Sequence, residues 1–480
     1  MMRRNWPWML TLLAAIIIRL VSLSAYPLHD TTEARYSEIA RLMVASNDWW
    51  VPQIAPGNPF WAKPPLSIWA TAASLKLLGA TEFAARLPAL LFSLIAVVLV
   101  FRYCSKRYSD AAAWVAATTF FCSGVGFIGA GAVMTDSALT LSVTISVIAF
   151  ASRIGQEKGR VSGFAFFFGI ALGLLAKGPI AAVLVGIPVL LWTLRYKSLL
   201  WLWTFLPWGR GLLLVCLLAL PWYVIAEVRS PGFLQYFVVG EHFYRFIDSG
   251  WSGDLYGNGH SRPLGTIWVF ALIGLFPWSF LCVYVLFKWR SKSQHRDKES
   301  LDTRFLLLAA LAPLLFFSFA KNILPAYVMP SLPALAVLCG KWLEHRARSL
   351  ALLGATVPAI FLTLFVTGVV AELDNKSQKQ LLETLAGEGG PRAVFYFEQM
   401  PHSASFYSKG ETVLIPNREE LEEVLAQQQD GVLLVLSKNE QKLGPSAHSC
   451  LSFKAVTKRY TIFSIGRCVG LTDNPLSATR

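Results

Sequence analysis

Charged residues are scarce in this chain. Lys, Arg, Asp and Glu make up 15% of its 480 residues, whereas about a quarter is usual in soluble domains. Hydrophobic residues reach 55%, and a soluble protein of this length could not bury so much apolar surface. The composition excludes a soluble enzyme and a disordered chain, and it predicts a polytopic α-helical membrane protein.

Cysteine is also scarce. Seven cysteines exclude a small secreted module held together by disulfides, and no Cys or His spacing is typical of a zinc or iron–sulfur site. Most of them lie in or beside apolar stretches, where a buried free thiol is expected. Cys450 and Cys468 instead flank the last strands predicted in the C-terminal tail, so a disulfide between them is one of two alternatives.

Basic residues outnumber acidic ones only in the first part of the chain. Residues 1–370 hold 31 Lys and Arg against 16 Asp and Glu, and residues 371–480 hold 12 against 13. The bases fall in short loops between apolar stretches, which is typical of loops on the cytoplasmic side. This pattern places Met1 in the cytoplasm, and it does not indicate a nucleic-acid partner.

Apolar stretches of about 17–25 residues predict the membrane-spanning helices. We expect about 11–13 of them, the first of which could also be read as a signal peptide, although Arg19 interrupts it. The two beside Lys177 and Pro179 could be one broken helix or a tight hairpin. The expected spans are 6–25, 83–101, 110–127, 136–152, 161–176, 178–194, 211–228, 264–287, 304–320, 323–340 and 349–370.

Most of the sequence outside the predicted spans lies in segments predicted on the periplasmic, or outer, side of the membrane. Outer loop 26–82 contains two amphipathic helices, Thr32–Ser46 and Leu66–Leu77. Residues 372–480 alternate strand-like runs with a helix, which predicts a small periplasmic α/β domain. We therefore expect a membrane domain over 1–371, with outer loops 26–82 and 229–263 as the roof of its site, and a C-terminal domain over 372–480. Its expected elements are strands Ala393–Phe397, Val413–Ile415, Val432–Leu436 and Thr461–Ile465 and helix Arg418–Gln429.

Three charged residues stand where the first span leaves the membrane. Asp30, Glu33 and Arg35 lie within six residues, and such a group is costly at a membrane boundary unless it is hydrated or functional. Helix capping by Thr31 or Thr32, with Glu33 in the first turn, would explain Glu33. It leaves Asp30 unexplained, which makes Asp30 the stronger catalytic candidate.

Two further candidates are Lys63 and Asp136. Pro64 keeps Lys63 out of the following helix, so its ammonium could hold a phosphate oxygen at the membrane boundary; the alternative is a lysine that only reaches the interface. Asp136 enters a span from an outer turn. It could cap the helix, or bind a metal or a substrate hydroxyl, or do both.

The remaining candidates interrupt apolar stretches or lie in the second outer loop. A lone Lys beside helix breakers marks either a turn or a site that faces a cavity, and Gly-rich segments with His and Arg favour binding of an anion over contact with lipid headgroups. These candidates are Lys177, Lys321, Tyr327, His242, Arg245, His260 and Arg262. Cations around carboxylates could stabilise a phosphate leaving group and activate an acceptor, as a transferase with a polyprenyl-phosphate donor requires.

An ordered set of motifs carries a resemblance to a known family. The motifs lie at residues 30–40, 63–66, 134–136, 177–179, 221–223, 241–246 and 316–327. They resemble those of GT-C glycosyltransferases of the protein-mannosyltransferase-like superfamily, and most of all the bacterial undecaprenyl phosphate-4-amino-4-deoxy-L-arabinose:lipid A transferases. The resemblance covers roughly residues 5–345.

The resemblance implies an inverting transfer on the periplasmic side of the bacterial inner membrane, from a polyprenyl phosphate to lipid A or another envelope glycan. By carry-over, Asp30 is the catalytic carboxylate, Asp136 a second active-site acid and Lys63 a phosphate ligand. Arg35, Lys177, Arg245, Arg262 and Lys321 are further cations for the donor phosphate. Tyr327, His242 and His260 line the substrate cavity.

The sequence departs from those relatives at two positions that matter. They have an Asp directly before the loop-one Glu, whereas here Thr31 and Thr32 separate Asp30 from Glu33, so Glu33 remains a rival for the catalytic role. They also have a Glu before the Lys of the Pro-Pro motif, where it helps to bind a metal. Here that residue is Ala62, so the sequence leaves a divalent metal open.

Rival functions remain at this point. One is transfer of a hexose or aminohexose to lipopolysaccharide core, O-antigen or a protein. Another is a transporter or flippase of lipid-linked sugars. Transporters tend to have inverted repeats and charges at mid-membrane; this sequence shows no internal repeat and its candidate charges lie at one face, which favours the enzyme over the flippase. A third alternative is a membrane sensor that binds its ligand with the C-terminal tail. In that case the acidic residues of the outer loops would be dispensable.

Overall fold

The computed structural model describes residues 2–154, 160–248, 250–257, 259–281, 300–344, 349–368, 376–387, 393–427 and 430–466. The chain divides into two compact units. The first, which we call the helical unit, comprises Met1–Ala25 and Leu42–Val369, and the second, the C-terminal unit, comprises Tyr26–Arg41 and Val370–Arg480. The boundary expected after residue 371 lies outside the described residues. The C-terminal unit also takes in part of outer loop 26–82, which the sequence analysis had assigned to the membrane domain.

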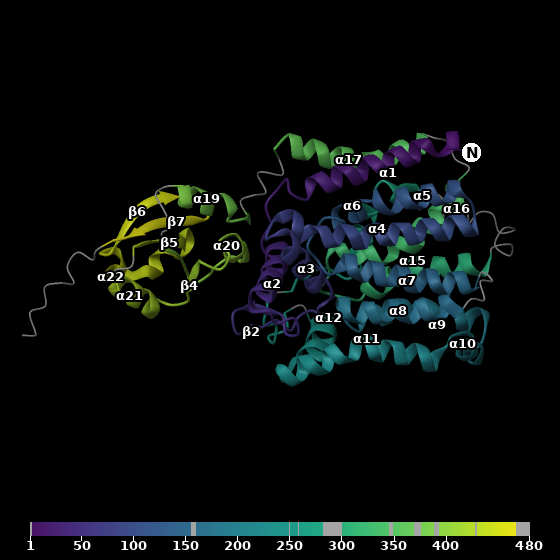
Figure 1. The fold of residues 1–480 in the computed structure, drawn as a ribbon, viewed down its shortest axis with the longest axis horizontal. Helices are drawn as coiled ribbons and strands as arrows, with labels where there is room; N and C mark the ends of the chain where they lie inside the picture. Colours follow the sequence, from purple (N-terminus) through teal and green to yellow (C-terminus); the bar gives the residue numbers. More distant parts are fainter. Residues whose placement is uncertain are drawn as a thin grey trace, which may run out of the picture. The chain divides into compact units, whose positions relative to one another are not determined.

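Long apolar helices build the helical unit, and they run alongside one another (Figure 1). Its helices are α1 (Met2–Ser22), α3 (Leu66–Leu78), α4 (Glu82–Arg107), α5 (Asp110–Phe121), α6 (Gly124–Gly129), α7 (Asp136–Ile154), α8 (Arg160–Lys177), α9 (Ile180–Tyr196), α10 (Leu199–Phe205), α11 (Trp208–Arg229), the π-helix η1 (Gln235–Tyr244), α12 (Arg245–Ile247), α13 (Thr266–Gly274), α15 (Leu301–Phe317), the 3₁₀ helix η3 (Pro325–Ser331), α16 (Leu332–Leu343) and α17 (Ser349–Val366). Helix α2 (Thr32–Ser46) and the short strands β1 (Gln53–Ala55) and β2 (Asn58–Pro59) belong to outer loop 26–82.

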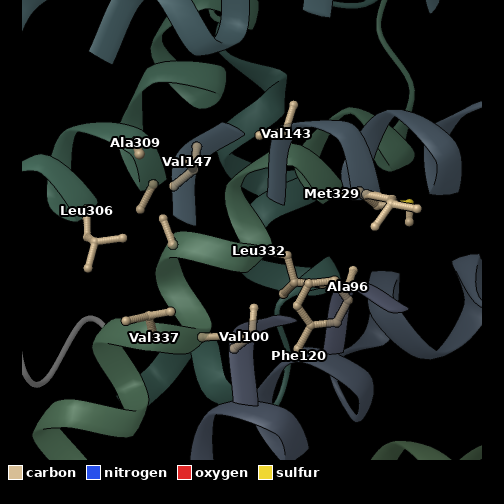
Figure 2. Packing of buried hydrophobic residues seen from close by; sticks show 14 of the residues in the cluster. Ala96, Val100, Phe120, Val143, Val147, Leu306, Ala309, Met329, Leu332 and Val337 are labelled. Carbon is tan, nitrogen blue, oxygen red and sulfur yellow. The ribbon is translucent and has the colours of Figure 1, made fainter. Parts of the chain in front are cut away.

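Small and branched side chains let these helices approach closely. In the core, Ala96 of α4 lies beside Phe120 and Leu332, and Ala309 of α15 and Val147 of α7 belong to the same cluster (Figure 2). Small residues at helix contacts are expected in a membrane, where van der Waals packing rather than exclusion of water holds helices together.

Five of the described helices are long and apolar enough to cross a membrane: Asn5–Ser22, Glu82–Arg107, Asp136–Ile154, Trp208–Arg229 and Pro325–Leu343. Shorter apolar helices occupy Leu66–Leu78, Ser162–Lys177, Ile180–Tyr196 and Leu350–Val366. The prediction of a multi-pass membrane protein is confirmed.

Several predicted spans are interrupted. The span expected over 110–127 is divided between α5 and α6, because Ser123 caps a new helix by accepting a hydrogen bond from the Gly126 N–H at 3.2 Å. The span expected over 264–287 is divided as well: α13 ends at Gly274, a turn covers 275–277, and residues 278–281 are helical again. Residues 282–287 lie outside the described part. The stretch around Lys177 is a hairpin of α8 and α9, the second of the two alternatives.

The C-terminal unit contains a five-stranded sheet in the order β4-β3-β5-β7-β6. Its strands are β3 (Ala393–Phe397), β4 (Val413–Ile415), β5 (Gly431–Leu436), β6 (Leu451–Val456) and β7 (Tyr460–Ile465). Its helices are α19 (Lys379–Gly387), α20 (His402–Tyr407), α21 (Arg418–Ala426), the 3₁₀ helix η5 (Ser437–Leu443) and α22 (Gly444–His448). The predicted α/β domain is therefore present, with β6 as an additional edge strand.

The sheet combines two patterns of pairing. Strand β3 pairs in parallel with both β4 and β5, while β7 pairs antiparallel with β5 and β6. Cys450, directly before β6, is disulfide-bonded, whereas its expected partner Cys468 lies outside the described residues.

Candidate active site

The hairpin of α8 and α9 brings two predicted residues together. Asp136 is the first residue of α7 and Lys177 the last of α8, so packing of these two helices places both at one end of the bundle. The Lys177 Nζ lies 2.5 Å from the Asp136 Oδ1, and both side chains are largely buried. The Lys177 Nζ also lies 4.4 Å from the ring centroid of Tyr327, a favourable cation–π distance.

A glycine closes this hairpin for a steric reason. Gly178 has φ +81°, and a Cβ at this position would lie 2.5 Å from the Cζ of Phe237. Only a residue without a side chain fits both requirements. Gly178 therefore fixes where Lys177 leaves α8.

Lys63 belongs to a second group of charges, built with the second outer loop. The Lys63 Nζ lies 2.7 Å from the Glu241 Oε2, and the Arg245 Nη1 lies 2.7 Å from the Glu241 Oε1. Arg245 in turn places its Nη2 3.1 Å from the Asp254 Oδ2. Glu241 thus bridges two predicted phosphate-binding cations, and its side chain is only 4% exposed.

Hydrogen bonds made by Trp61 and Tyr256 hold the segment with Lys63 beside that loop. The Trp61 N–H donates to the Tyr256 hydroxyl at 3.0 Å, and the Trp61 indole N–H donates to the Ser230 Oγ at 2.8 Å. The Tyr256 hydroxyl donates to the Pro59 carbonyl at 2.9 Å. These bonds fix the segment before Pro64, which explains how residues 178 positions apart meet.

His242 connects the two groups. Its Nδ1 lies 2.8 Å from the Phe237 carbonyl oxygen, and its Nε2 lies 3.0 Å from the carbonyl oxygen of Lys177. Burial lowers the pKa of His242, against the opposing effect of the two carbonyl groups. The ring therefore links η1 to the end of α8.

The charges of this combined cluster cancel. Three cations, Lys63, Lys177 and Arg245, face three carboxylates of Asp136, Glu241 and Asp254. Burial raises the pKa of Glu241, but attraction to Lys63 and Arg245 outweighs burial, so the pKa lies below its ordinary value. Glu241 is therefore ionised at pH 7.

Hydrogen bonds from backbone N–H groups hold the segment with His260 and Arg262 beside Lys321 and Asn322. The Arg262 N–H donates to the Lys321 carbonyl at 2.9 Å, and the His260 N–H donates to the Asn322 Oδ1 at 2.9 Å. The side chains of the three predicted residues, His260, Arg262 and Lys321, are exposed. They are free to reach a ligand, whereas the cluster above is already ion-paired.

The loop-one candidates lie in the C-terminal unit. The Asp30 carboxylate accepts a hydrogen bond from the Ser403 N–H at 3.1 Å, and it also accepts the Ser403 hydroxyl. Burial raises the pKa of Asp30, and the bonds from Ser403 oppose this. The structure therefore gives Asp30 a role in anchoring α20, and its catalytic role stays a prediction.

Glu33 and Arg35 lie on α2. Glu33 stands in its first turn, as the capping alternative expects. Arg35 has its guanidinium carbon 5.6 Å from the ring centroid of Tyr36.

The residues present do not form an evident metal site. Ala62 offers no ligand at the position where the resemblance implies a Glu, and Glu241, which is ion-paired with Lys63, is held by two cations. Among the described residues, no group of three or more His, Cys, Asp or Glu is arranged to hold a metal ion.

Sequence reasoning missed Glu241, Asp254 and Ser403. Glu241 stood inside a quoted motif, but an acid in an outer loop is normally hydrated, and its pairing depends on contacts across 178 positions. Asp254 and Ser403 had no motif to mark them.

Comparisons with known proteins agree with the fold. The family described as dolichyl-phosphate-mannose-protein mannosyltransferase matches residues 5–237. ArnT from Cupriavidus metallidurans in the apo state aligns with a TM-score of 0.77 at 18% identity, over 95% of this chain and 97% of that one. A second structure of that protein, bound to undecaprenyl phosphate, aligns equally well.

Curated relatives share one description. The undecaprenyl phosphate-alpha-4-amino-4-deoxy-L-arabinose arabinosyl transferase of Pseudomonas paraeruginosa is 30% identical over 385 residues, which cover 78% of this chain and 66% of that protein. The protein of the same description in Aeromonas hydrophila is 30% identical over 66% of this chain and 56% of its own length. The chain thus spans just under two thirds of the first of these relatives and less of the second. The resemblance inferred from the motifs is confirmed: the chain is similar to the dolichyl-phosphate-mannose-protein mannosyltransferase family over residues 5–237, and it has the fold of ArnT.

Proposed function

We propose that the protein is an inverting glycosyltransferase that moves a sugar from undecaprenyl phosphate to lipid A or another envelope glycan, with 4-amino-4-deoxy-L-arabinose as the preferred sugar. The observation that carries this proposal is the buried cluster in which Lys63 and Arg245 converge on one carboxylate, next to the Asp136–Lys177 pair. The names of the relatives support the donor.

In the proposed reaction, an acceptor oxygen attacks the anomeric carbon of the sugar. The bond from that carbon to the phosphate oxygen breaks, and undecaprenyl phosphate leaves with the electron pair. Lys63 and Arg245 stabilise the negative charge on the leaving phosphate. Arg262 and Lys321, which are exposed beside the same loop, attract the anionic substrates.

Asp136 takes the role of orienting the acceptor. Its carboxylate is paired with Lys177, and it can accept a hydrogen bond from an acceptor hydroxyl or from the amino group of the sugar. A lipid A phosphate is already ionised and requires no strong base.

The membrane placement completes the proposal. Cytoplasmic Met1 and the excess of bases in short inner loops put the ends of α7 and α8 that carry Asp136 and Lys177 on the periplasmic side of the bacterial inner membrane. The C-terminal unit then also lies in the periplasm.

Turnover of the donor by the purified protein tests the proposal. In detergent or nanodiscs with lipid A and undecaprenyl phosphate-4-amino-4-deoxy-L-arabinose, wild type should release undecaprenyl phosphate, and Asp136→Asn should be slower by about 10²-fold. Asp110→Asn is the matched control, because Asp110 also lies in the first turn of a helix, but at the opposite end of the bundle.

Equal rates for Asp136→Asn and wild type would show that Asp136 has no role in the reaction. No release by wild type with this donor, but release with a hexose donor, would change the sugar. Movement of intact donor across a vesicle membrane without release would favour the flippase.

A further inference from the structure

The Glu241 carboxylate occupies a place that suits a phosphate group. Its two oxygens each lie 2.7 Å from a cation, one from Lys63 and the other from Arg245. The Tyr236 hydroxyl approaches the Glu241 Oε1 at 3.5 Å. A phosphate can bridge the same two cations with two of its oxygens, because Arg and Lys recognise both anions through similar charge-assisted hydrogen bonds.

Both cations already hold an anion. The Lys63 Nζ already donates to the Ala62 carbonyl at 2.7 Å as well as to Glu241. Arg245 uses one terminal nitrogen for Glu241 and the other for Asp254. Its Nε is buried and has no hydrogen-bond partner among the described residues. It is a buried donor of Arg245 that is available to a ligand.

The net charge of the cluster also favours exchange of one of its carboxylates for the donor phosphate. The cluster of Lys63, Lys177 and Arg245 with Asp136, Glu241 and Asp254 is neutral before any substrate enters. A phosphate added to it leaves the cluster with net negative charge, which is costly in a poorly hydrated site. Departure of one carboxylate restores the balance, and Glu241 is the one that holds both cations proposed to bind the phosphate.

The backbone around Glu241 is irregular. Glu241 lies in the π-helix η1, a rare form that is frequent at functional sites. Gly240, the preceding residue, lies against Trp251, where a Cβ would come within 2.3 Å of the indole ring.

We propose that Glu241 is the exchangeable counter-ion of the donor-phosphate site. Its carboxylate holds Lys63 and Arg245 in place without substrate, gives them up to the donor phosphate, and competes with undecaprenyl phosphate after transfer so that the product leaves. This proposal rests on the proposed function, because it assumes that Lys63 and Arg245 bind the phosphate.

The proposal is tested by whether substitution of Glu241 strengthens or weakens the binding of undecaprenyl phosphate. Undecaprenyl phosphate itself is the probe, and its binding to the full-length protein in nanodiscs is measured for wild type, Glu241→Gln and Glu241→Asp. Gln has the size of Glu without its charge, so Glu241→Gln should bind the probe at least about tenfold more tightly and be more strongly inhibited by it as product. Asp keeps the charge but is too short to bridge both cations, so Glu241→Asp should lie between the two.

If the Glu241 carboxylate only positions Lys63 and Arg245, its loss should weaken the binding of undecaprenyl phosphate. Equal or weaker binding by Glu241→Gln would overturn the proposal. If Glu241→Gln does not fold, a folded Glu241→Asp that binds no more tightly than wild type overturns it instead. Asp302→Asn is the control for loss of a buried, paired carboxylate: its partner Arg107 lies at 2.7 Å and both belong to the opposite end of the bundle, so binding should be unchanged.

Lys63→Ala separates this proposal from the proposed function. If wild type binds the probe, Lys63→Ala loses it and Glu241→Gln gains nothing, only the role of Glu241 is wrong. If wild type does not bind undecaprenyl phosphate, the proposed function is wrong and the role of Glu241 falls with it.

Discussion

At the scale of single residues, the site depends on pairs that neutralise each other. Lys177 was expected to bind the donor phosphate, yet its ammonium lies 2.5 Å from Asp136, so without substrate its partner is that carboxylate. Lys63 and Arg245 are likewise paired with Glu241. The sequence could identify these cations because Lys and Arg are rare in apolar surroundings. It could not identify their partners, which depend on packing.

The roles of Asp30 and Glu33 can be separated by three variants. We expect Asp30→Asn to reduce transfer by about 10²-fold and Glu33→Gln to keep most of it, since Glu33 stands in the first turn of α2. Initial rates on equal amounts of folded protein measure this. Ser403→Ala is the control, because it removes the hydroxyl that Asp30 accepts but keeps the carboxylate.

An anchoring role alone would make Asp30→Asn and Ser403→Ala equally active and equally destabilised. A loss confined to Glu33→Gln would move the catalytic role to Glu33.

His402 makes the C-terminal unit sensitive to acid. Burial lowers the pKa of His402 to about 4, and the positive charge of Arg35 contributes. Because this folded-state pKa lies below the ordinary value of about 6.5, the neutral ring stabilises the fold above pH 6.5, and this contribution is lost as the pH falls towards 4.

The melting temperature of wild type should therefore fall more between pH 7.5 and pH 5 than that of His402→Gln. Asp30 acts in the opposite direction, since burial raises its pKa, and it is common to both proteins. Parallel pH profiles for the two proteins would show that His402 is not the titrating group.

At the scale of elements, the sequence predicted helices better than their interruptions. Helix α2 has the predicted bounds, and α3 differs by one residue, because amphipathic periodicity between helix breakers is a local property. The separation of α5 from α6 depends on one serine cap. Strand β6 has an irregular, mostly exposed burial pattern, so no alternation marked it.

The hairpin between α8 and α9 provides a test at this scale. Gly178→Ala should destabilise the protein by about 1–3 kcal/mol and slow transfer, because φ +81° is strained for Ala and its Cβ would press on Phe237. Gly186→Ala in α9 is the matched control, since a Cβ there meets nothing within 4 Å. Thermal melting and initial rates of both variants measure the effect.

A wild-type melting temperature and rate for Gly178→Ala would mean that the hairpin does not set the position of Lys177.

At the scale of the whole molecule, composition already determined the class of protein and the motifs determined the family. The division into two units was only partly predictable. The tail was recognisable from its balanced charge, but nothing in residues 26–41 shows that they pack with it, because that depends on Asp30 and Leu28 meeting Ser403 and Tyr407.

The central claim is that this protein transfers a sugar from undecaprenyl phosphate to lipid A or another envelope glycan. The most direct test is mass spectrometry of lipid A from cells that make undecaprenyl phosphate-4-amino-4-deoxy-L-arabinose and express either wild type or Lys63→Ala at equal levels. Lys76→Ala, on the exposed end of α3, is the control for loss of a lysine in the same loop. We predict one added aminopentose mass with wild type and Lys76→Ala, and its loss with Lys63→Ala. Unmodified lipid A with wild type, in cells shown to contain the donor, would contradict transfer of this sugar to lipid A.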